Sequence, residues 1–496
     1  MSMKLEPRTF RIEWDLHAWS GIVASTFLFV IFFTGIFSLV HEELHAWQSP
    51  ALQVSNEAPP DGRAPSFDAL LAVTKQHTAI PEGGDVGFSF DGTRIGYAWI
   101  SHAPTELEKE LTIDLASGQL VPEHSRLADE LYNMHFFYRV PGGQQLAGVI
   151  AVALFISVVA GLLIHLKDLK RQFWSFRPRL RLRFATSDAH KVLGVFGLPF
   201  TMMFGWTGAL LGLWGLAFTG ITGAAFQGDM ERAVRARGEE SWEREPAGKP
   251  AAMLSLDALV GRARAAADAR DTQLSWMGVQ LYGDERALAR VYFKSEGFEA
   301  ARYVVLDARD GAVVRTHRDA PPSAGLERVL FALHYASYGG MLVNALYMLL
   351  AFAVCAVIVT GNIVWLERRD PKREHRGNRF VERLTSGVCA GCVLGTAAYF
   401  AANRLLPSGI EARGDWEFGV YLAVWGFAAL SAFLPRWSAR QHAFAQSAAA
   451  SALFLFASRD VPRVLVIDLM LLVLAIACGG LAWLLASFAP ERGLEK

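Results

Sequence analysis

The sequence has few cysteines and no net charge, and each scarcity excludes a class of protein. Four cysteines among 496 residues cannot form the disulfide framework of a small secreted protein. The 48 basic residues equal the 48 acidic residues, so no overall charge favours binding to nucleic acid. The sequence also lacks a Rossmann fingerprint, a P-loop and a flavin-type loop, so this chain does not itself oxidise NAD(P)H.

Long apolar runs dominate what is present. Hydrophobic residues make up 52% of the sequence and the mean hydropathy is +0.24. The apolar residues gather in runs of about 20, the length that spans a bilayer. The pattern predicts an α-helical polytopic membrane protein with about eight transmembrane helices. The predicted spans are 18–40, 144–166, 190–217, 340–366, 384–404, 416–434, 441–458 and 464–488.

Basic residues are concentrated in three short stretches outside these spans. Lys and Arg crowd the loops 167–191 and 367–383, and further basic residues lie close to the N-terminus. Because short basic loops stay in the cytoplasm, both termini are predicted to be cytoplasmic. The two longer inserts, 46–135 and 220–334, then lie on the opposite side, which for a bacterial inner membrane is the periplasm.

The two inserts resemble each other. The first contains LTIDLASGQLV and the second YVVLDARDGAVV, and each pattern indicates a strand, an Asp, a turn with Gly and a second strand. This order is typical of a β-hairpin. Upstream, FDALLAVTKQH and LDALVGRARAAADA each predict a helix in the same relative place. Each insert is therefore predicted to be a small α+β domain.

The similarity between the two halves extends into the membrane helices. WDLHAWSGIVASTFLFVIFFTG aligns with SDAHKVLGVFGLPFTMMFGWTG, so His17 and His190 each stand 18 residues before the Gly of a Thr-Gly pair. His135 and His334 each precede a Gly-Gly pair and a span. A helix, an insert and a helix thus occur twice, which predicts an internally duplicated core. The resulting divisions are a first repeat 14–166, a second repeat 187–366 and a C-terminal four-helix membrane region 384–488.

The duplication places histidines at both faces of the predicted helical core. His17 and His190 open spans on the cytoplasmic side, whereas His135 and His334 enter spans on the periplasmic side. His165 ends the second span and has no counterpart in the second repeat. Ionisable residues within membrane segments are costly, so by default they predict a functional site.

Paired imidazoles at both membrane faces favour haem over other cofactors. A structural zinc site uses four clustered ligands, often cysteines, and a proton relay needs intramembrane carboxylates, of which the first four spans have almost none. A b-type haem needs two axial imidazoles from facing helices and an apolar slot. Gly21 and Gly194, one turn after His17 and His190, are expected to leave room for the flat ring.

Several assignments stay open at the level of sequence. A single histidine at a helix end is more often an interfacial anchor than a ligand. On the cytoplasmic side His17 and His165 compete as the partner of His190. His41 and His45, within HEELHAW, are expected to cap the first span, and contact with a metal or a substrate is the alternative.

A family resemblance rests on DLHAWSG, on the stretch GLLIHLKDLKRQFWSFRPRLRLRFATSDAHKVLGVFGLPF and on the paired inserts. Over residues 10–370 the chain resembles the PepSY-associated transmembrane family, which includes iron-regulated inner-membrane proteins and ferric-siderophore reductases. The resemblance implies haem b held between membrane helices by histidines, and electron transfer to a ferric chelate at the periplasmic face. In longer members a histidine often follows LPF of the third span, but Thr201 stands there. The helices 384–488 lie beyond the resemblance.

Together with what the resemblance implies, these features predict an inner-membrane protein with two haem b groups that passes electrons to a periplasmic ferric siderophore. The candidate haem ligands are His17, His135, His165, His190 and His334. The side chains predicted to face the substrate are Tyr138, Arg139, Tyr335 and Tyr338. The predicted partners are the lipid bilayer, the ferric siderophore and an electron donor, either membrane quinol or a separate cytoplasmic protein. The alternative is a non-enzymatic scaffold whose inserts are PepSY-type regulatory or protease-inhibitory modules.

Overall fold

The structure is a computed structural model, and its described residues group into two compact units. The described residues are 6–48, 66–90, 95–103, 106–115, 117–121, 125–166, 182–236, 244–269, 272–294, 302–317, 322–369, 376–407, 409–459 and 464–487. The first unit comprises Met1–Gln48, His124–Leu216 and Gly339–Lys496, and the second comprises Ser49–Glu123 and Ala217–Tyr338. The basic stretches 167–181 and 370–375, which orient the chain in the sequence-based prediction, lie outside the described residues.

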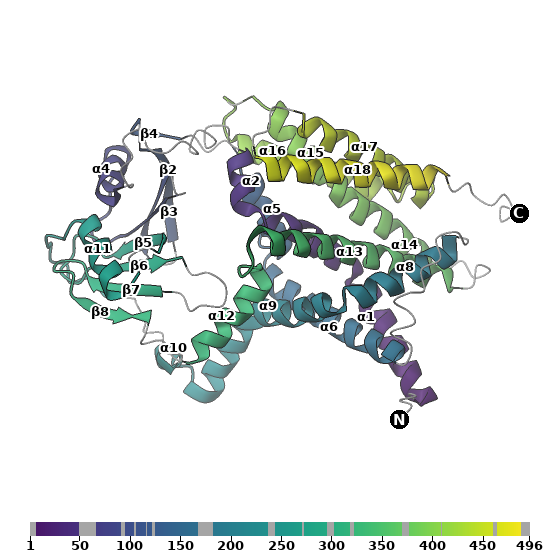
Figure 1. Cartoon of the computed structure of the whole chain (residues 1–496), viewed down its shortest axis with the longest axis horizontal. Helices are drawn as coiled ribbons and strands as arrows, with labels where there is room; N and C mark the ends of the chain where they lie inside the picture. Colours follow the sequence, from purple (N-terminus) through teal and green to yellow (C-terminus); the bar gives the residue numbers. More distant parts are fainter. Residues whose placement is uncertain are drawn as a thin grey trace, which may run out of the picture. The chain divides into compact units, whose positions relative to one another are not determined.

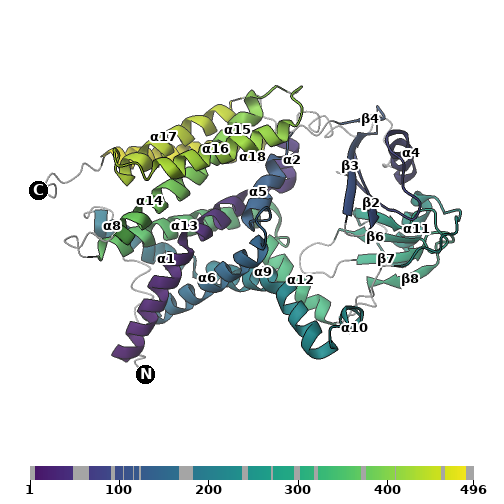
Figure 2. The same ribbon diagram turned by 180° about the vertical axis from the view of Figure 1, so that it is seen from behind.

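Helices alone form the described part of the first unit (Figure 1). They are α1 (Pro7–Ser38), α2 (His41–Gln48), α5 (Leu127–His135), α6 (Gly143–His165), α8 (Leu182–Phe196), α9 (Leu198–Phe226, which continues into the second unit), α13 (Gly340–Glu367), α14 (Arg376–Leu384), a π-helical turn (Thr385–Ala390), α15 (Gly391–Leu405), α16 (Arg413–Ser431), α17 (Ala439–Ala457) and α18 (Leu465–Ser487). α1 packs against α6 and α13, and α8 packs against α13. In the C-terminal region α15 packs against α16 and α17, and α17 against α18 (Figure 2).

Six of the described helical stretches are long and apolar enough to cross a membrane. They are α1, α6, α9, α13, the stretch Arg376–Leu405 and α18. The two other predicted spans, 416–434 and 441–458, are helical as α16 and α17 but do not belong to this set. α16 carries charged residues in its first turns, and α17 is rich in Ala, Ser and Gln, so neither is strongly apolar. The protein is thus a membrane protein by its helices, and the count of eight spans stays a prediction.

The predicted span 190–217 is broken into two helices. α8 ends at Phe196 and α9 begins at Leu198, with Gly197 between them. Pro199 lies in the first turn of α9, where its missing N–H costs nothing, and proline disfavours a helical conformation in the residue before it. The prediction of one continuous helix is therefore corrected, and His190 lies on α8 rather than on the long apolar helix α9.

The second unit is built on one eight-stranded antiparallel sheet with the strand order β4-β3-β2-β1-β5-β6-β7-β8. The strands are β1 (Asp85–Phe90), β2 (Ile95–Ala103), β3 (Glu106–Asp114), β4 (Gln119–Leu120), β5 (Leu274–Gln280), β6 (Leu288–Phe293), β7 (Arg302–Asp307) and β8 (Val313–Thr316). The predicted hairpins are present as β3–β4 and β7–β8. β1 of the first insert pairs with β5 of the second, with Val86 opposite Val279 and Phe88 opposite Met277. The inserts therefore share one sheet and do not form the two separate α+β domains that we expected.

Helices cover one face of this sheet (Figure 1). α4 (Phe67–His77) and α11 (Leu256–Ala266) are the two helices predicted from the inserts, and α10 (Met230–Ala236) and α12 (Pro322–Tyr335) complete the unit. Leu70 and Leu259 bury completely in a core that includes Phe88 and Met277 of the two central strands. Alternate strand residues point into this core, as expected for a sheet with one apolar face.

An aspartate in the first turn of each of α4 and α11 accepts hydrogen bonds at the N-terminus of the other helix. Asp68 of α4 accepts hydrogen bonds from the backbone N–H groups of Leu256 (2.8 Å) and Asp257 (3.3 Å). Asp257 of α11 in return accepts from the backbone N–H of Phe67 (2.8 Å) and from the Ser66 hydroxyl (2.5 Å). Two adjacent helix N-termini carry partial positive charge, and each carboxylate offsets the charge of the other helix. The exchange therefore ties the two inserts together beyond their shared sheet.

Replacing Asp68 or Asp257 by Ala is expected to lower the free energy of unfolding by about 1 kcal/mol, the typical value of a helix cap. Burial raises the pKa of Asp68, but hydrogen bonds from Ser255 and Leu256 outweigh it and hold that pKa below its ordinary value. The contribution of the Asp68 carboxylate to the free energy of unfolding is therefore complete at neutral pH and is lost as the pH falls below about 4. The measurement is the thermal unfolding midpoint of the detergent-solubilised protein at pH 7, with the exposed Glu82→Ala as control. An Asp68→Ala variant no less stable than that control contradicts the capping role.

Candidate functional site

Two of the predicted ligands, His17 of α1 and His190 of α8, lie beside each other. Their ring centres are 6.1 Å apart and their planes are inclined by 63°. A metal ion between two imidazoles, with metal–nitrogen bonds of about 2.0–2.1 Å, places the ring centres roughly 6 Å apart. The separation of the two rings therefore leaves room for one metal ion, which both histidines would hold.

A backbone carbonyl of the facing helix orients each of these imidazoles. The Nδ1–H of His17 donates to the carbonyl of Ser157 on α6 at 2.8 Å, and that of His190 donates to the carbonyl of Val357 on α13 at 2.9 Å. Because a carbonyl only accepts, the proton of each neutral ring lies on Nδ1 and the Nε2 atom keeps its lone pair. Metal-ligating histidines are commonly fixed in this way through their other ring nitrogen.

A glycine lies under each of the two rings. Gly161 follows Ser157 by one helical turn on α6, and Gly361 follows Val357 in the same way on α13. A Cβ atom on Gly161 would lie 2.9 Å from Nδ1 of His17, and one on Gly361 would lie 2.9 Å from Cε1 of His190. Contacts this short displace a side chain, so the ring and its carbonyl partner can meet only where the facing helix carries glycine.

His135 at the end of α5 repeats this arrangement farther along α1. Its Nδ1–H donates to the carbonyl of Ile31 at 2.7 Å, and a Cβ on Gly35 would lie 2.8 Å from its ring. Ile31 follows His17 by 14 residues, which is about 21 Å along a helix axis. Burial lowers the pKa of His135, which favours the neutral imidazole that a metal ligand requires.

His165 and His334 have different surroundings. His165 is the last residue of α6 and lies close enough to His190 to interact with it electrostatically. His334 is half-buried near the end of α12 in the second unit, with its ring centre 5.6 Å from that of Tyr335. Their assignment as haem ligands, and the pairing of His334 with His135, stay predictions.

The backbone after His135 and after His334 has the same unusual turn. Phe137 (φ 56°) and Ala336 (φ 55°), each two residues beyond its histidine, adopt the left-handed conformation. Residues other than glycine rarely adopt this conformation, because the Cβ atom then crowds the backbone. The same turn at matched positions of two diverged repeats ends α5 at His135 and α12 one residue after His334.

The four residues predicted to face a substrate do not share one environment. Tyr138 is 67% exposed and Tyr335 is 46% exposed. Arg139 donates to both carboxylate oxygens of Glu130, which is 2% exposed, and its guanidinium lies 5.2 Å from the ring centre of Phe418. Arg139 is therefore engaged in a structural ion pair that no sequence pattern indicates. Tyr338 is half-buried in the second unit, and a substrate role for any of the four stays a prediction.

The glycines under the imidazoles are not those that we expected to make room at the site. A Cβ on Gly21 would meet the hydroxyl of Ser157 at 3.4 Å, and one on Gly194 would meet nothing among the described residues within 4 Å. The glycines in contact with the imidazoles are Gly35, Gly161 and Gly361. A signal for two of them exists in the sequence, because SVVAG and VIVTG end at matched positions of the two repeats.

Replacing Gly161 or Gly361 by Ala is expected to destabilise the protein by about 1–3 kcal/mol, because the added methyl group presses on a buried imidazole. Gly426→Ala on α16 is the matched control, since its Cβ would meet nothing among the described residues within 4 Å. Alanine favours helix there and is expected to be neutral or stabilising by up to about 1 kcal/mol. The thermal unfolding midpoints of the detergent-solubilised variants check this, and equal midpoints for Gly161→Ala and Gly426→Ala contradict it.

Comparison with known proteins gives the family of this helical core. A family model described as the PepSY-associated TM region matches residues 14–368. A similar protein from Pseudomonas aeruginosa, named only as uncharacterized, is 30% identical over 329 residues, which are 62% of this chain and 79% of that protein. The matched residues include every candidate histidine ligand, whereas the C-terminal helices from α14 onward lie beyond them. The chain belongs to the PepSY-associated transmembrane family.

Proposed function

We propose that the protein is an inner-membrane haem b protein that passes electrons across the membrane to a periplasmic ferric siderophore. The observation that carries the proposal is the pair of His17 and His190, whose ring centres are 6.1 Å apart and whose Nδ1 atoms are both bonded to carbonyls. Two neutral imidazoles from different helices are suitable axial ligands for haem iron. A haem b held by them would supply one-electron transfer at the predicted cytoplasmic face.

Backbone and side-chain groups next to His17 and His190 would affect these two ligands differently. The carbonyls of Ser157 and Val357 set the tautomer and the direction of each ring. The Ser157 hydroxyl also lies 3.3 Å from Nδ1 of His17, a contact that Val357 cannot offer to His190. The two rings therefore share the same backbone contact but differ in side-chain hydrogen bonding, which tunes the basicity of a ligand.

Aromatic side chains fill the helical core farther along α1. The ring centre of Phe32 lies 6.4 Å from that of Phe200 on α9, which in turn lies 5.2 Å from that of Tyr347 on α13. All three side chains are less than 9% exposed. Such packing excludes water from the space between helices and supplies the apolar surroundings that a haem macrocycle requires.

For a second haem b, on the predicted periplasmic side, we propose His135 and His334 as ligands. The support is that Ile31 and Gly35 hold His135 as Ser157 and Gly161 hold His17, and that His334 occupies the matched place in the second repeat. His165 is the alternative ligand at the cytoplasmic site. The role of these residues is to bind and orient, each through one ring nitrogen.

Reduction of the bound iron is the chemistry that the proposed acceptor requires. Siderophores bind Fe(III) through hard oxygen ligands, and conversion to Fe(II) weakens that binding. The electrons are proposed to come from membrane quinol or from a separate cytoplasmic protein, with both termini in the cytoplasm and the sheet unit in the periplasm. The competing function is a regulatory or protease-inhibitory scaffold without a cofactor.

An optical spectrum separates the two functions. Protein produced with ample haem is expected to show the reduced-minus-oxidised bands of a b-type haem. His17→Ala and His190→Ala are each expected to lose the same part of the haem, because each removes one ligand of one site. His77→Ala is the control, since His77 lies on α4 and bonds to the carbonyl of Gly118. Absence of b-type bands from the unaltered protein rules out the proposed function.

The periplasmic assignment has its own test. His135→Ala and His334→Ala are each expected to remove about half of the haem per protein, as quantified by pyridine haemochrome, and to slow oxidation of the reduced protein by a ferric siderophore. In the double variant His135→Ala/His334→Ala the loss should equal that of either single variant, because both residues serve one site. Unchanged haem content in His334→Ala shows that the periplasmic pair is wrong.

A further inference from the structure

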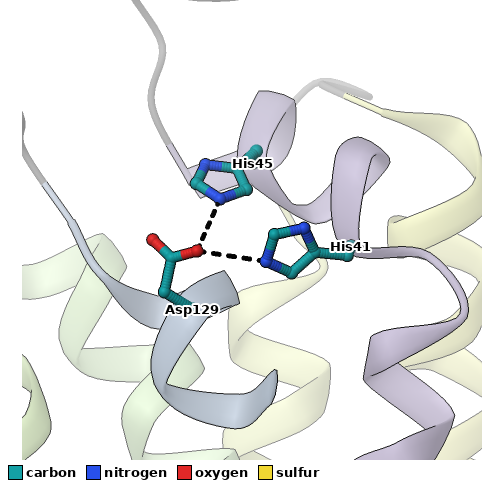
Figure 3. Close-up of side chains that lie close together, drawn as sticks. All are labelled: His41, His45 and Asp129. Atoms are coloured by element: carbon teal, nitrogen blue, oxygen red, sulfur yellow. Dashed lines mark hydrogen bonds and ion pairs between the residues drawn. The ribbon is translucent and has the colours of Figure 1, made fainter. Parts of the chain in front are cut away.

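A second cluster of ligand-type side chains lies beside the end of α1. His41 and His45 stand one helical turn apart on α2, and both direct Nε2 at the same carboxylate oxygen of Asp129 on α5 (Figure 3). The distances to Oδ1 are 3.1 Å from His41 and 3.0 Å from His45. All three side chains are partly exposed, at 33% for each histidine and 44% for Asp129, so solvent reaches the cluster.

The spacing of these atoms is that of ligands around one metal ion. Two ligand atoms bonded to the same ion at about 2.0–2.2 Å, at angles between octahedral and tetrahedral, lie roughly 3 Å apart. In the cluster, the three ligand atoms all lie within 4.8 Å of one another. An ion can thus replace the present hydrogen bonds through small side-chain movements, and the exposed side leaves positions for water or a further ligand.

We propose that His41, His45 and Asp129 bind a divalent transition-metal ion, and that Fe(II) is the ion they serve. Two imidazoles and one carboxylate are the donor set of non-haem Fe(II) sites, whereas hard ions such as Mg²⁺ prefer oxygen ligands alone. The choice of Fe(II) rests on the proposed function, because reduction of a ferric siderophore releases that ion. The binding of a divalent transition metal does not depend on it.

The charge of the cluster suits a cation. The carboxylate of Asp129 accepts a hydrogen bond from each of His41 and His45 through the same Oδ1 atom. It lies between two imidazoles that can each offer a lone pair once the ion takes the place of the Nε2 proton.

Gln48 opposes the change of tautomer that metal binding by His45 requires. Its amide is fixed because Nε2 donates to the carbonyl of Ser125 (3.0 Å) while Oε1 accepts from the N–H of Ala128 (2.8 Å). The other hydrogen on Nε2 faces Nδ1 of His45, at 3.2 Å, so that nitrogen accepts and the proton of His45 lies on Nε2. Metal binding at Nε2 must move this proton to Nδ1, against the amide of Gln48. The site is therefore expected to bind an ion and release it readily. A site that receives Fe(II) released from a siderophore and passes it on requires this behaviour.

The cluster lies on the same short helix as a proposed haem ligand. Asp129 and His135 are both residues of α5, six positions apart, which is about 9 Å along the helix axis. α5 itself is held at its start by the contacts of Gln48 with Ser125 and Ala128. The metal cluster therefore stands next to the place where the proposed electron path reaches the periplasmic side.

The test is Co(II) uptake by the tag-free, detergent-solubilised full chain, measured by equilibrium dialysis and mass spectrometry of the metal. Co(II) is a stable probe for Fe(II), and this readout is unaffected by haem absorbance. The unaltered protein is expected to bind one saturable Co(II) per chain. Asp129→Asn and His41→Gln are each expected to raise the apparent Kd of that site at least tenfold. His41→Gln is the second variant, and His77→Ala, outside the cluster, is expected to leave uptake unchanged.

Two results overturn the metal site. One is the absence of saturable Co(II) uptake by the unaltered protein, and the other is equal uptake by the unaltered protein and by both cluster variants. Because Asp129→Asn could disturb α5, each variant is first checked by size-exclusion chromatography, and His41→Gln decides if Asp129→Asn does not fold. Uptake by a protein that lacks b-type bands upholds the site while the proposed function fails. Haem bands in a protein that takes up no Co(II) uphold the proposed function while the metal site fails.

Discussion

The helical core depends on one contact, an imidazole that donates to a backbone carbonyl of a facing helix across a glycine. The carbonyls of Ser157, Val357 and Ile31 lie in helix interiors, where each also accepts from the amide one turn later. A carbonyl has a second lone pair, and a glycine at that next turn exposes it to a neighbouring helix. A polar ring between apolar helices is costly unless it is bonded, so each contact fixes both the histidine and the spacing of the helices. It joins α1 to α6, α13 to α8, and α1 to α5.

The C-terminal helices, which lie beyond the family match, attach to this core through buried polar contacts. The indole N–H of Trp47 on α2 donates to Asp468 of α18 at 2.8 Å. Asn362 on α13, which is 3% exposed, donates to the hydroxyls of Ser25 on α1 and Thr385 of the π-helical turn. Contacts of this kind are few and directional, and they fix where α15 to α18 dock more specifically than apolar packing does.

The sheet unit follows a different principle from the helices. Each insert contributes one half of the sheet. β1 would be the edge strand of the first half and β5 that of the second, but the two strands pair with each other. The exchange of Asp68 and Asp257 caps adds a polar link at the helix N-termini. Both interactions join matched positions of the two repeats, so the duplicated chain folds as one symmetric-looking unit. The pairing of β1 with β5 leaves neither of these two strands as an exposed edge, which would invite aggregation.

Much of this follows from the sequence alone. Apolar runs of membrane length determine the long helices α1, α6, α9, α13 and α18, because such runs can satisfy their backbone groups in a bilayer only as helices. The matched spacing of His17 and His190 identifies both as special positions. Strand alternation and turn glycines determine the hairpins β3–β4 and β7–β8. These are local properties, set by residues within a few turns or strand lengths of one another.

The tertiary structure decides what depends on meetings between distant segments. The sequence leaves His17 and His165 as rivals for His190, and only the packing of α1, α8 and α13 brings the ring of His17 to 6.1 Å from that of His190. It likewise decides that Gly161, rather than Gly21, lies against His17, and that Asp129 joins His41 and His45. No periodicity encodes such contacts, because each depends on the relative rotation and height of two helices. Those are set by the whole of their interface and not by any single stretch of sequence.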